Sequence, residues 1–594
     1  MKTLESNTND YRFFTAVTLG WVFWLWISLI LTLGNTFYTS LIWVSLGAAV
    51  FGTIYIISRR KLFKGLSREF LTVSFASLII AAAITSFTVP TIFSGRDQGS
   101  YSNAAIHLSE NHQLAFSTPA SEAFFELHEP GRALNFPGFD YTNDGKLTPQ
   151  FPLGYIVWLA SLFTLFGLSG LMIANAVTLA LFLVAFYFLL RLFVSRSYAT
   201  WGFAIASTSL PVVWFSKITL SENLAIALFT LLALNLILAF KEKSLIFAIT
   251  ASALAGFFAF TRIEGLTFLA ITLIILAFSS SVRALLKSKP VAYAILPTIV
   301  FLILFARGFF INLPFYKAIA KAGLNKWQSL FETCASDDCL ADTSVSLWGI
   351  FWSYGLVPVF IIGAVSIVIF FKRRNRLALI PFFLALPTFF YLVQPSISID
   401  HPWMLRRFVF SIYPTLLFSA IVGIALIQEF LTKKYPKSFL FAKRYYANIL
   451  LSMLLLSQLP FALQYATFSD NKGLLEQTEA LSRHFSSKDL VLVDRLATGD
   501  AWSMTPEPLA FFGIENAAYF FNPQDFATLD TRGFENTYLI VSENEAARYL
   551  TSSDKRFTFV DTFTFETERL EQTTGTTPPQ AVRSRTAVMI LKVE

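Results

Sequence analysis

The stretch Phe13–Leu33 reads FFTAVTLGWVFWLWISLILTL and contains no charged side chain. A helix needs about 20 mostly apolar residues to cross the ~30 Å hydrocarbon core of a bilayer, and this stretch has that length. Similar apolar blocks recur along the chain, which is 55% hydrophobic and 14% charged, with a mean hydropathy of +0.58. Soluble globular proteins carry about 25% charged residues. We therefore predict a polytopic α-helical membrane protein.

Hydrophobicity predicts about 13 transmembrane segments. Lysines and arginines cluster in short loops between them, and all these clusters fall on one side of the membrane if the N-terminus is cytoplasmic. The positive-inside rule therefore predicts a multi-pass protein of the plasma or inner membrane with a cytoplasmic N-terminus. It also accounts for the net charge of +8 without nucleic acid. The predicted segments are 13–33, 37–57, 70–90, 170–191, 198–215, 223–240, 245–260, 265–280, 290–312, 346–370, 377–395, 407–428 and 446–465.

Composition changes after Ala466. Residues 467–594 have the mixed composition of a soluble domain, with strand patterns such as Leu490–Asp494 and helical stretches between some of them. This alternation predicts a small extracytoplasmic α/β domain. The aromatic segment Phe151–Phe166 is short for a span and predicts a helix at the outer membrane interface. We divide the chain into an N-terminal tail with two additional helices (1–69), a transmembrane core that includes the outer loop 91–152 (70–466), and the α/β domain (467–594).

Charged residues recur at the predicted outer ends of the helices. Asp97 lies in the hexapeptide Arg96–Tyr101 (RDQGSY), which follows the third span, and Glu222 begins the sixth. Taken singly, such residues have ordinary explanations, because an acid at a helix N-terminus complements the helix dipole and an interfacial arginine snorkels to the head groups. Acids and arginines from several helices on one face instead predict a cavity with a base and an anion clamp. The further members of this set are Arg262, Glu264, Arg406 and Arg407.

The order of these short motifs resembles the GT-C superfamily of glycosyltransferases. The resemblance is closest to the family 39 type, which includes protein O-mannosyltransferases and the aminoarabinose transferase of lipid A. It covers roughly residues 70–594 and rests on RDQGSY before a long outer loop, SENL, TRIEG and PWMLRRF, at 96–101, 221–224, 261–265 and 402–408.

The resemblance implies an inverting transfer of a sugar from a polyprenyl-phosphate carrier to an acceptor hydroxyl on the outer face. It implies that Asp97 is the base. Gln98 stands where the family usually has a Glu, which leaves no second carboxylate beside Asp97. Glu222 stands where relatives often have an Asp.

The chemistry of such a transfer requires a base and cations. The leaving phosphate of a sugar phosphodiester is stable as an anion, so no general acid is needed. A base must take the proton of the acceptor hydroxyl, and arginines suit the phosphate because their donors match its oxygens. We predict Asp97 and Glu222 as catalytic residues, Arg262, Arg406 and Arg407 as phosphate-binding residues with Arg96 and Lys217 as weaker candidates, and Tyr101, Glu264, His401 and Trp403 as substrate-binding residues.

No cofactor is predicted. The sequence around Asp97 lacks the Asp-x-Asp carboxylate pair of metal-dependent GT-C relatives, so we expect metal-independent activity. Cys334 and Cys339 lie in one predicted outer loop, where they form either a local disulfide or two free thiols. With no His nearby they do not make a zinc site.

Three alternatives remain open. A transporter or lipid flippase would also place ionisable groups near helix ends, although no repeat halves are detectable. An O-antigen ligase or polymerase usually concentrates its arginines in one long outer loop, whereas here they are spread over several helix ends. A structural subunit without activity is the third. The sequence leaves the sugar, the carrier lipid, the acceptor (a protein, lipid or glycan) and the oligomeric state open.

Overall fold

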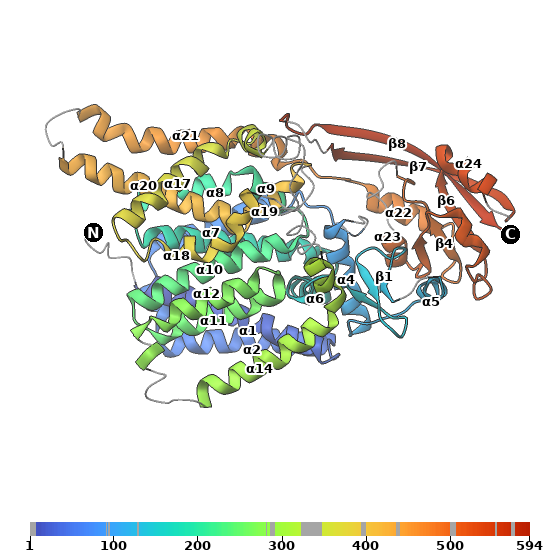
Figure 1. The fold of residues 1–594 in the computed structure, drawn as a ribbon, viewed down its shortest axis with the longest axis horizontal. Coiled ribbons are helices and arrows are strands. Elements are labelled where there is room, and N and C mark those ends of the chain that lie inside the picture. The colour runs from blue at the N-terminus through green and yellow to red at the C-terminus, as the bar shows by residue number, and fades with distance from the viewer. Residues whose placement is uncertain are drawn as a thin grey trace, which may run out of the picture.

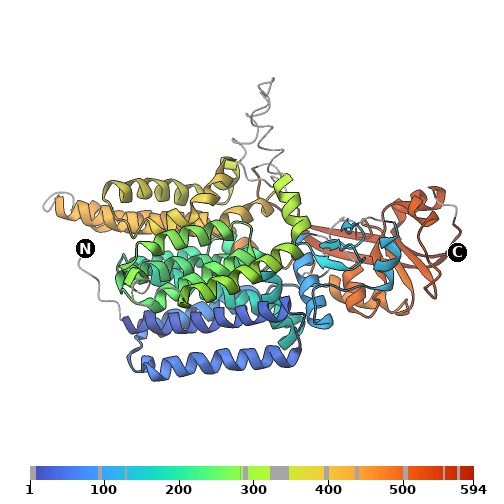
Figure 2. The same cartoon turned by 60° about the horizontal axis from the view of Figure 1, so that its bottom comes forward.

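The computed structural model describes residues 8–90, 92, 96–127, 130–280, 282–284, 292–321, 347–393, 400–434, 440–498, 506–552, 555–571 and 576–594. Most of its helices form a single bundle, and a domain built on a β-sheet lies at one end of it (Figure 1). α1 (Thr8–Leu33) begins at the opposite end of the bundle, and the turned view in Figure 2 shows the same separation. The candidate disulfide pair, Cys334 and Cys339, lies outside the described residues.

Within the described residues, seven helices are long and apolar enough to cross a membrane. Two bent helix pairs, Pro297–Ile311 with Leu313–Lys321 and Leu347–Ser353 with Val357–Lys372, raise the number to nine if each counts as one span. The protein is therefore a polytopic α-helical membrane protein, as predicted. The long helices are α1 (Thr8–Leu33), α2 (Thr39–Arg59), α3 (Arg68–Thr85), α7 (Leu168–Arg191), α10 (Ser221–Lys241), α20 (Ile412–Lys434) and α21 (Leu440–Ala466), with α14 (Ala292–Ile311) and α17 (Val357–Lys372) in the bent pairs.

The remaining predicted spans are shorter or broken helices. α11 (Leu245–Thr261) and α12 (Gly265–Ala277) each have fewer than the usual 20 residues of a span. The predicted span 198–215 is interrupted between α8 (Arg196–Ser207) and α9 (Leu210–Phe215). α18 (Ile380–Ala385) continues into the 3-10 helix η2 (Leu386–Leu392), and η3 (Trp403–Leu405) into α19 (Arg406–Val409); η1 (Leu62–Gly65) follows α2. Length and hydropathy alone thus support fewer spans than the 13 predicted, although helix is present at each predicted segment.

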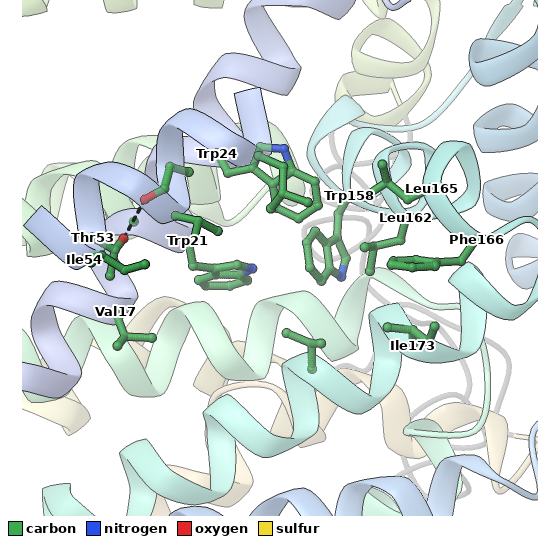
Figure 3. A pocket seen from close by; sticks show the side chains of 15 residues that line it. Val17, Trp21, Trp24, Thr53, Ile54, Trp158, Leu162, Leu165, Phe166 and Ile173 are labelled. Carbon is green, nitrogen blue, oxygen red and sulfur yellow. Dashed lines mark hydrogen bonds between the residues drawn. The ribbon is translucent and has the colours of Figure 1, made fainter. Parts of the chain in front are cut away.

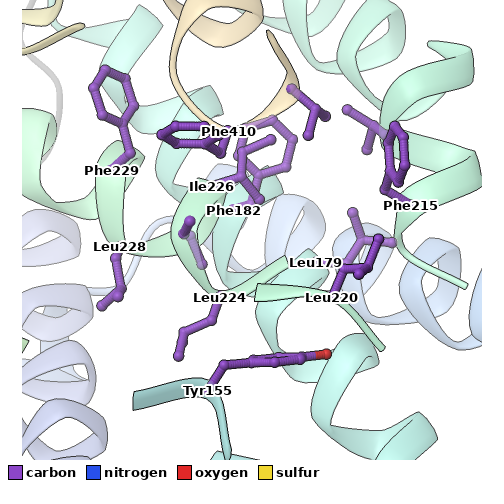
Figure 4. Close-up of a cluster of buried hydrophobic side chains, with 14 of the residues drawn as sticks. Tyr155, Leu179, Phe182, Phe215, Leu220, Leu224, Ile226, Leu228, Phe229 and Phe410 are labelled. Carbon is purple, nitrogen blue, oxygen red and sulfur yellow. The ribbon is translucent and has the colours of Figure 1, made fainter. Parts of the chain in front are cut away.

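α10 lies at the centre of the bundle and is buried over almost its whole length. Its side chains Leu224, Ile226 and Phe229 belong to the apolar cluster that Figure 4 shows, together with Phe182 of α7. The turn before α10 is fixed because the amide of Asn223 donates to two main-chain carbonyls, at 2.9 and 2.6 Å. This packing holds the first turn of α10, which carries Glu222, in a fixed position.

The two additional N-terminal helices differ in how they pack. α1 is half buried, and its Thr15 hydroxyl donates to the side-chain oxygen of Asn235 in α10 at 3.1 Å. α2 lies at the edge of the bundle and exposes large apolar side chains such as Trp43 and Phe51. Lipid chains can cover such side chains, so α2 is the more peripheral of the two.

An apolar hollow of about 420 Å³ lies between α1, α2, α7 and α6 (Leu153–Phe166). Figure 3 shows Trp21 and Trp24 of α1 beside Trp158 of α6, with ring centroids 5.8 and 5.6 Å from that of Trp158. No charged side chain lines this hollow. It therefore lacks the groups that acid–base or phosphate chemistry needs.

α6, which the sequence predicts as an interfacial helix, lies at the end of the bundle that faces the sheet domain (Figure 1). Its residues Leu153–Leu162 are all buried, and it packs against α4 (Asp97–Asn111), α7 and α1. Its aromatic side chains pack against these neighbours, and Trp158 donates to the carbonyl of Ala174 at 3.3 Å. The interfacial depth of α6 stays a prediction. Between α4 and α6 lie α5 (Pro119–Phe125) and an antiparallel sheet of β1 (Gly131–Arg132), β2 (Phe139–Tyr141) and β3 (Leu147–Pro149).

The C-terminal region forms a five-stranded mixed sheet of order β5-β4-β6-β8-β7. β4 pairs in parallel with β5 and β6, whereas β8 pairs antiparallel with β6 and β7. Strands and helices alternate as predicted, so this region has the α/β character expected from its sequence. Its elements are α22 (Leu474–Ser482), β4 (Leu490–Val493), α23 (Pro506–Phe511), β5 (Ala517–Tyr519), η4 (Pro523–Ala527), β6 (Thr537–Ser542), α24 (Glu543–Ser552), β7 (Phe557–Leu570) and β8 (Ala581–Val593).

The sheet domain is joined to the outer loop and to the bundle. Asn135 of the outer loop pairs with Tyr519 at the edge strand β5 through two hydrogen bonds of 2.5 and 3.0 Å. Phe124 of α5 belongs to the apolar core of the sheet domain. Beyond β7, the chain returns to the bundle, where Tyr465 of α21 donates to the carbonyl of Pro579 at 2.7 Å. The outer loop is thus held against the sheet domain, which is itself joined to α21.

Candidate active site

Asp97 is the first residue of α4, at the point where the chain leaves α3 for the outer loop. A carboxylate in the first turn of a helix is favoured by the helix dipole. Its side chain is 36% exposed, and its Oδ2 accepts a hydrogen bond from Nη1 of Arg406 at 2.6 Å. The predicted base and one predicted phosphate ligand are therefore direct partners.

Arg406 joins Asp97 to Glu222. Its Nε donates to Oε1 of Glu222 at 2.7 Å, and the indole of Trp403 lies over its guanidinium at 4.6 Å. The side chain of Arg406 is 6% exposed and that of Glu222 is fully buried. The buried pair of Arg406 and Glu222 is strongly held, because separating it would leave a charge away from water.

Arg262 forms the deeper half of the same network. Its Nη1 is 2.8 Å from the Glu222 oxygen that Arg406 also contacts. Its Nε and Nη2 donate to the two carboxylate oxygens of Glu264 at 3.1 and 3.2 Å, which is the bidentate geometry that arginine favours. The Tyr391 hydroxyl donates to Glu264 at 2.5 Å, and the Phe410 ring lies 4.2 Å from the guanidinium carbon. All of these charged groups are buried.

Arg407 differs from its two neighbours. Among the described residues no carboxylate forms an ion pair with it, and its buried Nε has no hydrogen-bond partner. Its guanidinium lies over the ring of Tyr391 at 5.3 Å. A buried donor without a partner carries a desolvation cost, and a cation with unused donors is a natural place for an anion to bind.

Arg96 and Trp403 lie on the partly exposed side of this network, next to Asp97 and Asp400, which we call the entrance. Arg96 is 3.6 Å from Asp400, and its guanidinium carbon lies 5.6 Å from the centre of the Trp403 ring. Trp403 therefore has an arginine on two sides, since Arg406 also contacts its ring. The half-buried ring is accessible to a ligand at the entrance.

Tyr101 and His401, two predicted substrate-binding residues, are buried. Tyr101 stacks on Phe151 with 4.7 Å between ring centroids, and burial raises the pKa of its phenol. The imidazole Nδ1 of His401 is 2.6 Å from the Tyr354 hydroxyl. Both side chains therefore pack the walls around the network in this structure.

Lys217 has a structural set of partners. Its Nζ donates to the carbonyls of Tyr465 and Phe468 at 2.5 and 2.7 Å and to that of Ala466 at 3.2 Å. These three bonds match the three donors of an ammonium group, and burial lowers its pKa to about 8. The ammonium binds the end of α21 and the start of the sheet domain.

Sequence reasoning missed two residues of the site, Tyr391 and Asp400. Tyr391 lies in an apolar segment of several aromatic residues, where nothing in the pattern distinguishes it from a lipid-facing side chain. Asp400 lies beside the predicted His401 and Trp403, so its proximity in sequence was the available signal. Within the described part of the chain, no group of three or more His, Cys, Asp or Glu residues has the arrangement of a metal site.

Comparisons with known proteins give structural neighbours only. No family model matches the chain, and no curated protein matches it. ArnT from Cupriavidus metallidurans is similar in structure in its apo state, with 10% identity, 88% of this chain and 97% of ArnT covered, and a TM-score of 0.47. The same protein bound to undecaprenyl phosphate gives 10% identity, 88% and 98% coverage and a TM-score of 0.46.

A second neighbour is the oligosaccharyltransferase of Archaeoglobus fulgidus in its apo form. It shares 10% identity over 80% of this chain and 70% of its own, with a TM-score of 0.46. All three of these likenesses have TM-scores below 0.5 and 10% identity. At this level of similarity they add nothing about residues, so the function proposed below rests on the side chains of this chain.

Proposed function

We propose that the protein is a membrane glycosyltransferase that moves a sugar from a polyprenyl-phosphate-linked donor to an acceptor hydroxyl. The observation that carries this proposal is the network of Asp97, Arg406, Glu222 and Arg262, contributed by α4, α19, α10 and the end of α11. It brings a partly exposed carboxylate, which can act as a base, next to arginines that can hold a phosphate.

In the proposed reaction Asp97 takes the proton of the acceptor hydroxyl. The acceptor oxygen then forms a bond to the anomeric carbon, while the bond from that carbon to the phosphate oxygen breaks and its electron pair leaves with the phosphate. A single displacement of this kind inverts the anomeric centre. The polyprenyl phosphate departs as an anion, so the reaction needs neither a general acid nor a redox partner.

We assign the phosphate to Arg407 and Arg406. Arg407 has one buried donor, its Nε, without a partner among the described residues. Arg406 is next to it in sequence and contacts the partly exposed Asp97. Arg262 is held on both sides by buried carboxylates, and Lys217 by three carbonyls, so we leave both out of the phosphate site. Glu222 is fully buried and shared by two arginines, which makes it a positioning residue rather than a catalytic one.

The proposed orientation places this network on the extracytoplasmic side. The C-terminal end of α20 lies at the same end of the bundle as the start of α1, far from the sheet domain (Figure 1). A cytoplasmic location of the basic loops therefore supports an extracytoplasmic site and sheet domain. The sheet domain contacts the loop that carries Asp97, which favours a role in holding that loop beside the acceptor.

The proposal is tested with purified protein in nanodiscs and a set of radiolabelled polyprenyl-phosphate sugars. We expect wild-type protein to consume one of these donors, by slow hydrolysis or by transfer to a membrane extract, and Asp97→Asn to lose this activity. Asp144→Asn is the matched control, because Asp144 is an exposed carboxylate of the same outer loop. If no donor is consumed or bound, the transporter hypothesis replaces the transferase hypothesis, and flux assays would test it.

A further inference from the structure

The contact between Asp97 and Arg406 competes with the roles that both side chains have in the proposed reaction. The carboxylate must accept a proton, yet its Oδ2 is already occupied by Nη1 of Arg406 at 2.6 Å. The guanidinium must hold a phosphate, yet two of its nitrogens are already used by Asp97 and Glu222. While Arg406 occupies Oδ2 of Asp97, an acceptor hydroxyl cannot take its place there.

The two carboxylates on Arg406 are unequal. Glu222 is fully buried and is held in place by Arg262 as well, at 2.8 Å, so its removal from Arg406 would leave a charge without water. Asp97 is 36% exposed and can be solvated when it leaves. Arg406 thus has one permanent partner, Glu222, and one replaceable partner, Asp97.

We propose that the phosphate of the donor displaces Asp97 from Arg406, so that the base becomes available only when the donor is bound. This inference rests on the proposed function and adds an order to it: donor first, acceptor second. The exchange is of ion-pair partners alone, and no covalent bond forms or breaks. Without a donor, Asp97 remains paired with Arg406.

A phosphate can compete with Asp97 because it gains a second cation. Arg407 follows Arg406 directly in the chain, and its buried Nε has no partner among the described residues. A phosphate has several acceptor oxygens and can bind two guanidinium groups at once, whereas Asp97 contacts Arg406 through one oxygen. The Trp403 ring, 4.6 Å from the guanidinium carbon of Arg406, keeps this group in place during the exchange.

The test measures the affinity of undecaprenyl phosphate for purified protein in nanodiscs, without any acceptor. If Asp97 competes with the phosphate, Asp97→Asn binds the probe more tightly than wild type, by about tenfold. A double-mutant cycle with Arg406→Gln identifies the cause. The gain from Asp97→Asn should vanish in the Arg406→Gln background, because the contested partner is gone.

A general loss of negative charge near the phosphate would instead tighten binding by the same factor in both backgrounds. That result, or an Asp97→Asn affinity equal to or weaker than wild type, would overturn the inference and leave the proposed function intact. If wild-type protein does not bind undecaprenyl phosphate, the proposed function fails and the inference with it. Should Arg406→Gln not fold, Arg406→Lys replaces it, since a lysine ammonium cannot reproduce the two-sided contact of the guanidinium and should reduce the gain.

Discussion

The charged network has two halves that contain the same residue types but differ in how deeply these are buried. In the deep half, Arg262, Glu222, Glu264 and Tyr391 satisfy one another, and no charged group among them is more than 9% exposed. In the entrance half, Asp97 is partly open to solvent and Arg407 has an unused donor. Burial with complete pairing fixes helices to one another, whereas partial exposure leaves groups free for substrate.

Breaking the deep half should have the largest effect on stability. Arg262→Met leaves Glu222 and Glu264 without their shared cation, and we expect a loss of about 3–5 kcal/mol of unfolding free energy. Thermal melting of the purified protein in detergent measures this loss. If Arg262→Met melts like wild type and only donor affinity falls, Arg262 belongs to the entrance half.

Removing the unpaired cation should change binding without changing stability. Arg407→Gln deletes a charge that has no carboxylate partner among the described residues, so we expect a melting temperature within about 2 °C of wild type. The KM for the donor should rise about tenfold or more, because a charge-assisted contact to phosphate is lost. Arg373→Gln, at the C-terminal end of α17, is the matched control. A clear drop in melting temperature with an unchanged KM would contradict this assignment.

The Lys217 anchor provides a smaller, purely structural effect. Lys217→Met removes the donors that hold three carbonyls near the end of α21, and we expect a loss of about 1–3 kcal/mol of unfolding free energy. Donor KM should remain unchanged. Melting curves and donor titrations on the same preparation separate the two. If the KM for the donor rises while stability is unchanged, Lys217 is a phosphate-binding residue after all.

The smallest expected effect is that of metal removal. Asp97 and Glu222 are bridged by a guanidinium, which already supplies the positive charge between them. We therefore expect the rate of transfer to be unchanged in EDTA. Activity that EDTA abolishes and Mg²⁺ or Mn²⁺ restores would show that the entrance half holds a metal and would require a different mechanism.

Sequence alone predicted the helical membrane class and the α/β character of the C-terminal region, because both follow from local periodicity. Leu490–Val493 is a buried strand as its apolar run indicates, and α1 covers the charge-free block Phe13–Leu33. The burial of α6 within the protein was not predictable in this way. Aromatic residues suit both an interface and a protein interior, and only tertiary packing decides between them.

The residue types of the candidate site were predictable, but their pairing was not. Asp97 and Arg406 lie 309 residues apart in the chain and meet only through the packing of α4 and α19 near α10. Nothing local distinguishes Arg262, which is fully paired, from Arg407, which is not. Lys217 was predicted as a weaker phosphate-binding candidate from its charge and position. Its contacts with three main-chain carbonyls could not be predicted, because a carbonyl partner leaves no signal in the sequence.

Measuring turnover and melting temperature together for Asp97→Asn and Arg262→Met tests the division between the two halves most directly. The account predicts that Asp97→Asn loses about 10²–10⁴ in the rate of donor consumption, the typical contribution of a general base, and melts within a few degrees of wild type. Arg262→Met should instead lower the melting temperature strongly. Near-normal turnover in Asp97→Asn would contradict the central claim and remove Asp97 from the mechanism.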